Sequence, residues 1–370
     1  MNTSADIIII GAGIAGASLA NELSSNHSVI LLEAETQPGY HSTGRSAAVF
    51  LPTSGPGLIL SLVHASGDFF HNTPQGFCEH PLLSPRTTMM IAKSGDDEHF
   101  DLGLSNGMQE ISTTQALEKV PAINTQNYTK FSIDPQTFDI DVDALLAAHI
   151  KRLKKNAGQL VTNAQVIKLG HHNNLWTVTT KQQEFNAPII VNAAGAWADH
   201  VAELADLKAL SIQPKRRSAA LIDVSDKWDV SHWPFVIAAG DRFYFRPIGK
   251  KLMISPADQT PVEPHDAWAD DMALAHAMED FQQATGFEVT HLEHTWAGLR
   301  SFAPDEHPVV GFDPRAKGFF WLAGQGGYGI ETSPAISRIA SAFIAQQNIP
   351  DDIKALGIEQ SSLHPERFIS

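Results

Sequence analysis

The sequence lacks three features that would restrict where the protein works. It has a single cysteine, Cys78, so it forms no intramolecular disulfide, and a reducing compartment suits it. No uncharged apolar run approaches the ~20 residues that cross a bilayer. The first residues include no basic segment of the kind that opens a signal peptide. We therefore predict a cytoplasmic protein with no transmembrane segment, and the sequence leaves peripheral docking to an inner membrane open.

Positive charge and metal-binding motifs are scarce as well. Lys and Arg number 26 against 41 Asp and Glu, which gives a formal net charge of −15. Because nucleic acids and anionic lipids select basic surfaces, we expect no nucleic-acid partner. The histidines are scattered and no HExxH or CxxC motif occurs, so we expect no metal site. A small molecule is the expected partner.

Short apolar runs predict an α/β fold. A strand at 5–13, a helix at 15–25 and a strand at 27–34 form one β-α-β unit, and runs this apolar are typical of a parallel sheet that is covered on both faces. A β-rich, antiparallel block follows at 210–265, and sheet-type segments return at 188–196 and 318–325. Further helices are expected at 57–73, 114–119, 141–156, 196–206, 267–285 and 332–347.

This order of segments predicts two interleaved domains. The fold class is α/β (α+β), with a Rossmann-like nucleotide-binding domain and a discontinuous substrate domain on a mixed or antiparallel sheet. The nucleotide domain comprises 1–80, 141–210 and 296–370, and the substrate domain comprises 81–140 and 211–295.

A dinucleotide-binding fingerprint lies between the first strand and the first helix. In "GAGIAG", Gly11 permits a tight turn, Gly13 lets the backbone approach a pyrophosphate, and Gly16 allows close helix–strand packing. The phosphates then lie at the helix N-terminus, where free N–H groups favour them. Glu33 ends the second strand, where a carboxylate binds a ribose hydroxyl and disfavours NADP, although NAD and FAD both remain open. Ile14, Ala15 and Ala34 complete this part of the predicted site.

Three further stretches favour FAD over NAD. The polar segment "GYHSTGRSAA" follows the Glu33 strand, and "PIIVNAAGAWAD" is a buried strand that ends in small residues. Near the C-terminus, "QGGYGIETSP" places glycines at a helix start, and such a start would stabilise the negative charge that develops on N1 and O2 of a reduced flavin. The cofactor residues predicted from the last two stretches are Ala194, Gly195, Trp197, Gly326, Gly327, Tyr328, Gly329 and Ile330.

These stretches, with "PGYHSTGRSAA", "QPKRRSA" and "EHTWAGLRSF", resemble the D-amino-acid oxidase-like family of FAD-dependent oxidoreductases, and within it the bacterial D-arginine dehydrogenases. The resemblance implies FAD bound non-covalently, and the surroundings of Cys78 do not match a covalent flavin attachment. It implies that the backbone of Val166 meets the adenine. It also implies that the remaining flavin contacts come from Ser42, Thr43, Arg45, Ser46, Ala47 and Ala48.

The same resemblance implies a substrate site. Arg300 and Arg217 are the candidates for a carboxylate clamp, because the planar donor fork of arginine matches a carboxylate. Tyr244 would add a hydroxyl donor, and the carbonyl of Gly327 would receive the substrate amine. Arg300 is the first choice because its surroundings are apolar, and Arg216 is rejected in favour of Arg217.

The resemblance implies FAD-dependent oxidative deamination of D-amino acids, in which a hydride passes from the α-carbon to flavin N5 and the imino product hydrolyses to a 2-oxo acid and ammonia. The substrate pocket departs from D-arginine dehydrogenases at Val49, Ser54 and Thr88, which replace a His, a Tyr and the Glu that pairs with the substrate guanidinium. A buried cationic side chain would lack its counter-ion. We therefore expect neutral or apolar side chains to be preferred over that of D-arginine.

The sequence leaves several alternatives open. An oxidase that uses O₂ with glycine, sarcosine or D-amino acids would share these motifs, as would a non-catalytic flavoprotein. A 2-hydroxy acid dehydrogenase would need a base for the hydroxyl proton, and no histidine in the sequence stands out as that base. The electron acceptor is a quinone, an electron-transfer protein or O₂.

Overall fold

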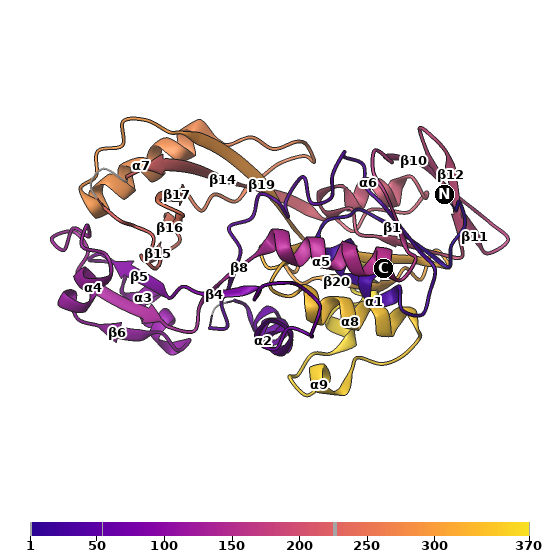
Figure 1. Cartoon of the computed structure of the whole chain (residues 1–370), viewed down its shortest axis with the longest axis horizontal. Helices are drawn as coiled ribbons and strands as arrows, with labels where there is room; N and C mark the ends of the chain where they lie inside the picture. The colour runs from indigo at the N-terminus through magenta and orange to yellow at the C-terminus, as the bar shows by residue number, and fades with distance from the viewer. Residues whose placement is uncertain (1, 54, 225–227, 370) are drawn as a thin grey trace.

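A computed structural model describes residues 2–53, 55–224 and 228–369. Figure 1 shows two lobes arranged along the long axis. One lobe contains the chain termini and β1 (Ile7–Ile10), and the other contains α7 (Asp271–Thr285) and β5 (Thr88–Ala92).

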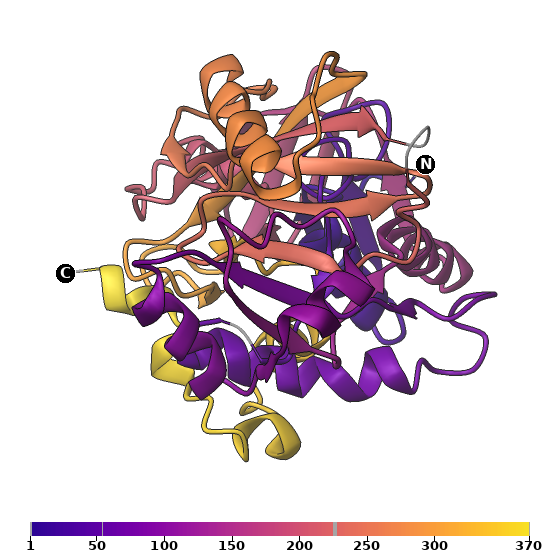
Figure 2. The same cartoon turned by 90° about the vertical axis from the view of Figure 1, so that its left-hand side faces the viewer.

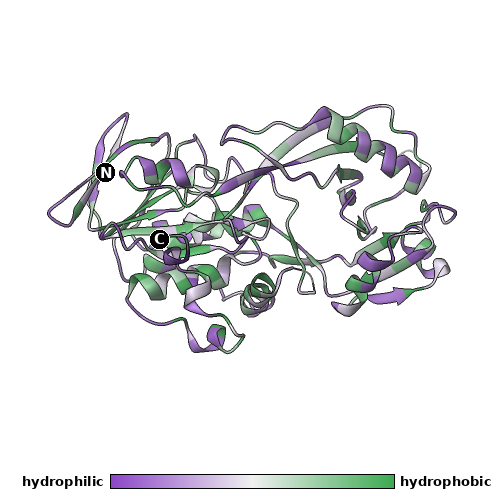
Figure 3. Ribbon diagram, turned by 180° about the vertical axis from the view of Figure 1, so that it is seen from behind, coloured by the Kyte–Doolittle hydropathy of each residue, from purple (hydrophilic) through white to green (hydrophobic). Residues whose placement is uncertain are grey.

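A six-stranded sheet forms the centre of the first lobe, in the order β20-β21-β13-β1-β2-β9. All neighbouring pairs are parallel except β20 with β21. The central strand β1 is four isoleucines long and buried along its whole length, as expected for a parallel sheet covered on both faces. Figure 3 shows hydrophobic residues, in green, along the strands of the lobe that contains the chain termini. The other strands are β2 (Val29–Leu32), β9 (Gln159–Val161), β13 (Ile189–Asn192), β20 (Val309–Phe312) and β21 (Phe319–Ala323).

The two faces of this sheet are covered differently. Ile7 and Ile9 pack into a core with helices α1, α5 and α8, whereas Ile8 and Ile10 pack against the antiparallel strands β10, β11 and β12. The β10–β11 turn at 173–174 has positive φ at both residues, which is typical of a tight antiparallel hairpin. These elements are α1 (Ile14–Leu23), α5 (Val142–Lys155), α8 (Ser333–Ile344), β10 (Val166–His172), β11 (Leu175–Thr180) and β12 (Glu184–Ala187).

A ten-stranded sheet forms the second lobe, in the order β22-β19-β14-β17-β16-β15-β5-β7-β6, with β18 beside β14. Helix α7 packs against β14 and β17 (Figure 2). Its strands besides β5 are β6 (Gln109–Ile111), β7 (Lys130–Asp134), β14 (Gln213–Asp223), β15 (Phe235–Ala238), β16 (Tyr244–Ile248), β17 (Lys251–Ser255), β18 (Thr260–Pro261), β19 (His294–Phe302) and β22 (Gln325–Gly326).

A small sheet of β3 (Val49–Phe50), β8 (Phe138–Ile140) and β4 (Leu83–Pro85) contributes a further layer. The remaining elements are helices α2 (Gly57–His71), α3 (Asp97–Ser105), α4 (Thr113–Lys119), α6 (Ala198–Glu203) and α9 (Asp351–Lys354), with 3₁₀ turns at Gly195–Trp197, Gln360–Ser362 and Pro365–Phe368.

The predicted fold class is confirmed, and all the predicted helices are present, with ends that differ from the predicted ones by up to four residues. Helix α7 begins at Asp271 rather than at 267, because Asp270 caps it by accepting a hydrogen bond from the Ala273 N–H at 2.9 Å. Helices α3 and α9 were not predicted. Strand β19 pairs with β14 along its whole length and therefore crosses the predicted domain boundary at 296, and the domain division itself stays a prediction. Among the described residues, no helix is long and apolar enough to cross a membrane.

Candidate functional site

One cavity of about 740 Å³ extends from the β1–α1 turn to the glycine-rich turn before α8. It lies where the parallel strands β1, β2 and β13 reach the same edge of their sheet. The carboxyl edge of such a sheet is where open α/β folds bind their ligands. The other walls come from the ten-stranded sheet, so both lobes contribute to the cavity.

The β1–α1 turn leaves no room for side chains. Gly11 has φ +104°, and a β-carbon there would stand 2.4 Å from the carbonyl oxygen of Ala193. A β-carbon on Gly16 would stand 1.9 Å from the carbonyl oxygen of Gly11. Gly13 precedes the first turn of α1, whose Ile14 N–H donates to Oγ1 of Thr43 at 3.0 Å. The backbone here can therefore approach a phosphate closely.

Glu33 is held rigidly beside this turn. Its Oε2 accepts a hydrogen bond from the N–H of Ala12, and its Oε1 accepts one from the N–H of Glu35, each at 3.0 Å. The side chain is buried and lines the cavity, and the backbone carbonyl of Glu33 accepts a hydrogen bond from the N–H of Ala164, two residues before Val166, at 2.8 Å. This fixed carboxylate stands at the end of β2, where the sequence predicted a ribose contact.

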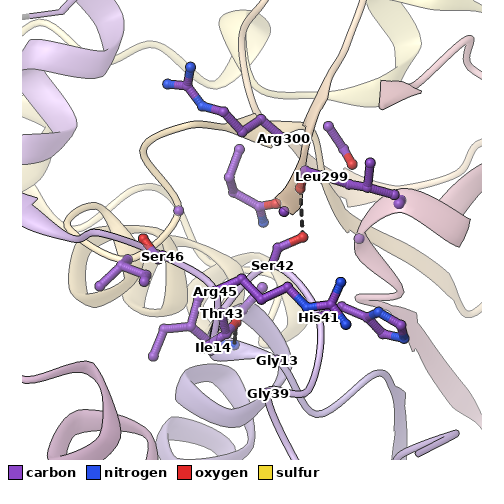
Figure 4. Close-up of a pocket in the computed structure, with 18 of the residues that line it drawn as sticks. Gly13, Ile14, Gly39, His41, Ser42, Thr43, Arg45, Ser46, Leu299 and Arg300 are labelled. Carbon is purple, nitrogen blue, oxygen red and sulfur yellow. Dashed lines mark hydrogen bonds between the residues drawn. The ribbon is translucent and has the colours of Figure 1, made fainter. Parts of the chain in front are cut away.

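The 42–48 segment docks on the second lobe. Oγ of Ser42 donates to the carbonyl oxygen of Leu299 at 2.6 Å (Figure 4). The guanidinium of Arg45 pairs with Asp266 and donates to the carbonyl oxygen of Ala267 at 2.9 Å. Arg45 lines the cavity, but its side chain extends toward His41 and away from Arg300 (Figure 4). Its guanidinium is therefore held by protein groups, and the flavin contact expected of Arg45 stays a prediction.

Strand pairing brings the two predicted clamp arginines onto one face of the ten-stranded sheet. Arg217 is opposite Gly298 and Arg300 is opposite Lys215 on the paired strands β14 and β19, so the two arginines are diagonal neighbours. Both line the cavity, and so does Tyr244 from β16. Nε of Arg217 donates to the carbonyl oxygen of Asp258 at 2.9 Å.

Arg216, the rejected neighbour, lies on the other side of the strand. Its Nη2 pairs with Oδ2 of Asp270 at 2.5 Å, and it is not among the cavity residues. Successive side chains of a strand point to opposite faces, which separates Arg216 from Arg217.

Arg300 has no hydrogen bond or ion pair within the part of the chain that the structure describes. Its Cζ lies 5.7 Å from the ring centre of Phe302 and 5.9 Å from that of Tyr328. Burial, and next the positive charge of Arg217, lower the pKa of its guanidinium. A buried cation without a counter-ion is costly. The arrangement is therefore suited to binding an anion.

The wall beside these cations is apolar. Val49, Leu51, Phe235 and Met253 line the cavity here, and the ring of Phe235 meets that of Tyr244 edge to face at 5.3 Å. Side chains of this kind favour an apolar ligand group.

Thr88 does not line this wall, contrary to our expectation. It is buried on β5, and its hydroxyl accepts a hydrogen bond from Oγ1 of Thr137 at 2.9 Å. The paired strands β15 and β7 on either side of β5 keep it in the sheet interior. Ser54, the third predicted pocket residue, lies outside the described residues. Cys78 donates to the carbonyl oxygen of His80 and is away from the cavity.

Glu331 is among the cavity residues that sequence reasoning missed. Its Oε2 accepts a hydrogen bond from the N–H of Leu51 at 3.1 Å. Burial raises the pKa of its carboxyl to about 8, against the hydrogen bond from Leu51 and the charge of Arg300. One signal was present in the sequence: Glu331 is the only charged residue between Lys317 and Arg338.

Nearly all the predicted cofactor residues line this one cavity. Gly16 is the exception among them, because its role is the contact between α1 and the β1 turn. Within the described ranges, no group of His, Cys, Asp and Glu side chains could hold a metal ion.

Comparison with known proteins decides the family. The family model described as "FAD dependent oxidoreductase" matches residues 6–342. The chain belongs to this family. FAD is its cofactor. The cavity suits FAD because it joins the glycine turn after β1 to the glycine turn before α8, with exposed backbone at both ends.

Relatives of this flavoprotein act on different substrates. It is 24% identical to a glycerol 3-phosphate dehydrogenase of Caloramator mitchellensis, over 90% of this chain and 72% of the relative. Its fold is similar to that of a glycine oxidase from Geobacillus kaustophilus, with a TM-score of 0.80, 20% identity and coverage of 94% and 96%. It is also similar to an L-α-glycerophosphate oxidase from Mycoplasma pneumoniae with FAD bound, with a TM-score of 0.81, 19% identity and coverage of 93% and 95%. The closer likeness to D-arginine dehydrogenases stays a prediction.

Proposed function

We propose that this flavoprotein oxidatively deaminates D-amino acids with neutral or apolar side chains. The observation that carries the proposal is the half-buried guanidinium of Arg300, which faces the cavity without a partner among the described residues and stands beside an apolar wall. An α-amino acid offers the two groups that match, a carboxylate and a side chain. The D configuration rests on the family resemblance of the sequence.

Four groups have roles in this proposal. Arg300 and Arg217 hold the substrate carboxylate, and the hydroxyl of Tyr244 adds a donor. The carbonyl of Gly327 receives the amine and so turns the α-carbon toward the cofactor. FAD, when bound, supplies the two-electron oxidant. Fixed placement of the reacting carbon is the contribution that the protein itself makes.

The apolar residues that line this wall of the cavity support a substrate with a neutral side chain. Phe235, Met253 and Val49 would surround it, and a guanidinium there would lose its hydration without gaining an anionic partner. Glu331 is held near Arg300, and because burial raises its pKa to about 8 it offers a substrate guanidinium no fixed negative charge at neutral pH.

Phosphate is the competing ligand, because two neighbouring guanidinium groups also suit a phosphate and a relative is named for glycerol 3-phosphate. The test is anaerobic bleaching of the flavin in the purified holoenzyme. D-Leucine, D-methionine and D-phenylalanine should bleach it faster than D-arginine, their L-enantiomers or glycerol 3-phosphate. Bleaching by glycerol 3-phosphate alone, or by D-arginine far above the others, would contradict the proposal.

The electron acceptor is a separate question with its own measurement. We propose a dehydrogenase, which should turn over faster with a quinone or dye acceptor than with O₂. Hydrogen peroxide formed at the full rate of substrate oxidation under air would instead identify an oxidase.

A further inference from the structure

Glu331 is a buried carboxyl in the cavity that the proposed roles do not use. It follows the glycine-rich turn, four residues after Gly327, and its side chain lines the same end of the cavity as Arg300. The N–H of Leu51 donates to its Oε2 at 3.1 Å. Its Oε1 has no hydrogen-bond donor in the part of the chain that the structure describes. One oxygen is thus fixed, and the other is left for a ligand.

The proposed reaction needs a proton acceptor near the substrate amine, which the proposal places at the carbonyl of Gly327. An amino acid carries an ammonium group at neutral pH, and its nitrogen cannot share a lone pair with the α-carbon until one proton has left. Arg300 and Arg217 cannot accept that proton, because they remain cationic. Tyr328 is a poor acceptor, since burial raises the pKa of its hydroxyl.

We propose that Glu331 accepts the proton that the substrate ammonium loses before oxidation. This inference rests on the proposed function. In this step an N–H bond of the substrate breaks and an O–H bond forms on the Glu331 carboxylate, with no change of oxidation state. FAD is the oxidant in the step that follows.

The charged surroundings of Glu331 suit this role. Arg300 faces it from β19 and favours its ionised form, whereas burial opposes ionisation more strongly. Tyr328 is the titratable neighbour from its own turn. On the side of α2, His64 bonds to the carbonyl oxygen of Pro52, next to Leu51. The balance leaves a carboxyl that can both take and release a proton near pH 8, which is the condition for efficient proton transfer in that range.

The decisive experiment is anaerobic stopped-flow reduction of the holoenzyme by D-leucine across a pH series, for wild type, E331Q and E118Q. Glutamine keeps the shape and can still accept from Leu51. Glu118 is exposed on α4 and serves as the matched control. We expect E331Q to lower the second-order reduction rate on the order of 10²-fold near pH 8, where a substantial part of Glu331 is ionised. The gap should close at high pH, where the solvent supplies neutral amine.

Two outcomes would overturn the role of Glu331 while the proposed function stands: no gap at any pH, or a gap of constant size at every pH. The second would indicate a purely structural residue. If no amino acid bleaches the wild-type flavin, the proposed function itself fails.

An infrared titration provides a readout that does not depend on turnover. The protonated carboxyl band of Glu331 should disappear as the pH rises through the range near 8, in wild type and E118Q but not in E331Q. A band that titrates in the ordinary range of glutamate would overturn the inference.

Discussion

The guanidinium of Arg300 lies directly against the α-carbon of Gly327. A β-carbon built on Gly327 would stand 1.5 Å from Nη2 of Arg300. The glycine-rich turn therefore shapes the anion site as well as the proposed cofactor site. A single methyl group at this position would force the guanidinium to move.

Gly327→Ala should weaken substrate binding through Arg300. We expect the dissociation constant of D-leucine to rise by about 10²-fold, since losing one partner of a buried charge pair costs about 2–5 kcal/mol. The measurement is the substrate dependence of anaerobic flavin reduction. Gly57→Ala is the control, because no atom lies within 4 Å of a β-carbon there. If the effect runs through Arg300, the double variant G327A/R300K should be no worse than R300K.

Arg300→Lys keeps the positive charge and removes the planar fork. We expect the substrate dissociation constant to rise by about 10²-fold with FAD still bound, because a lysine cannot hold a carboxylate through two parallel hydrogen bonds. Arg338→Lys is the matched control, since Arg338 forms an exposed pair with Asp352. Unchanged substrate affinity in R300K would contradict the assignment of the carboxylate to Arg300.

Gly11→Ala should damage both stability and flavin binding. The new β-carbon would meet a backbone carbonyl at 2.4 Å in a residue with φ +104°, and neither strain can be relieved by rotating a side chain. Thermal unfolding and the flavin-to-protein absorbance ratio measure the two effects. Gly170→Ala, with open space around its β-carbon, should change neither. A G11A protein with full flavin content would contradict the predicted pyrophosphate turn.

Glu331 should make stability fall as the pH rises. Its pKa is raised from 4.5 to about 8 in the folded protein, so the folded state holds more protons than the unfolded state between these values. Stability should therefore fall by about 1.4 kcal/mol per pH unit in that window. Urea unfolding of wild type and E331Q across the window tests this: the stability of E331Q relative to wild type should increase with pH. A difference that is independent of pH would show that the carboxyl titrates normally.

The sequence by itself determined the cofactor half of the protein. The isoleucines of β1, the spacing of Gly11, Gly13 and Gly16, and Glu33 at the end of β2 are local features. The hydrophobic pattern of a strand and the spacing of glycines in a turn each depend on a few neighbouring residues. Both could therefore be recognised in the sequence without knowing the fold.

Tertiary structure alone decided which polar groups are satisfied. Arg45 finds Asp266, which lies 221 residues away, and Glu331 finds Leu51 across 280 residues. Pairing of β14 with β19 sets Arg217 beside Arg300, and pairing of β5 with β7 and β15 holds Thr88 inside the sheet. Such partners depend on strand order and register, which are set by packing over the whole chain. The glycine turn after β1 and the place of Glu33 were therefore predictable from the sequence, whereas the neighbours of Arg300 and the buried acid near it were not.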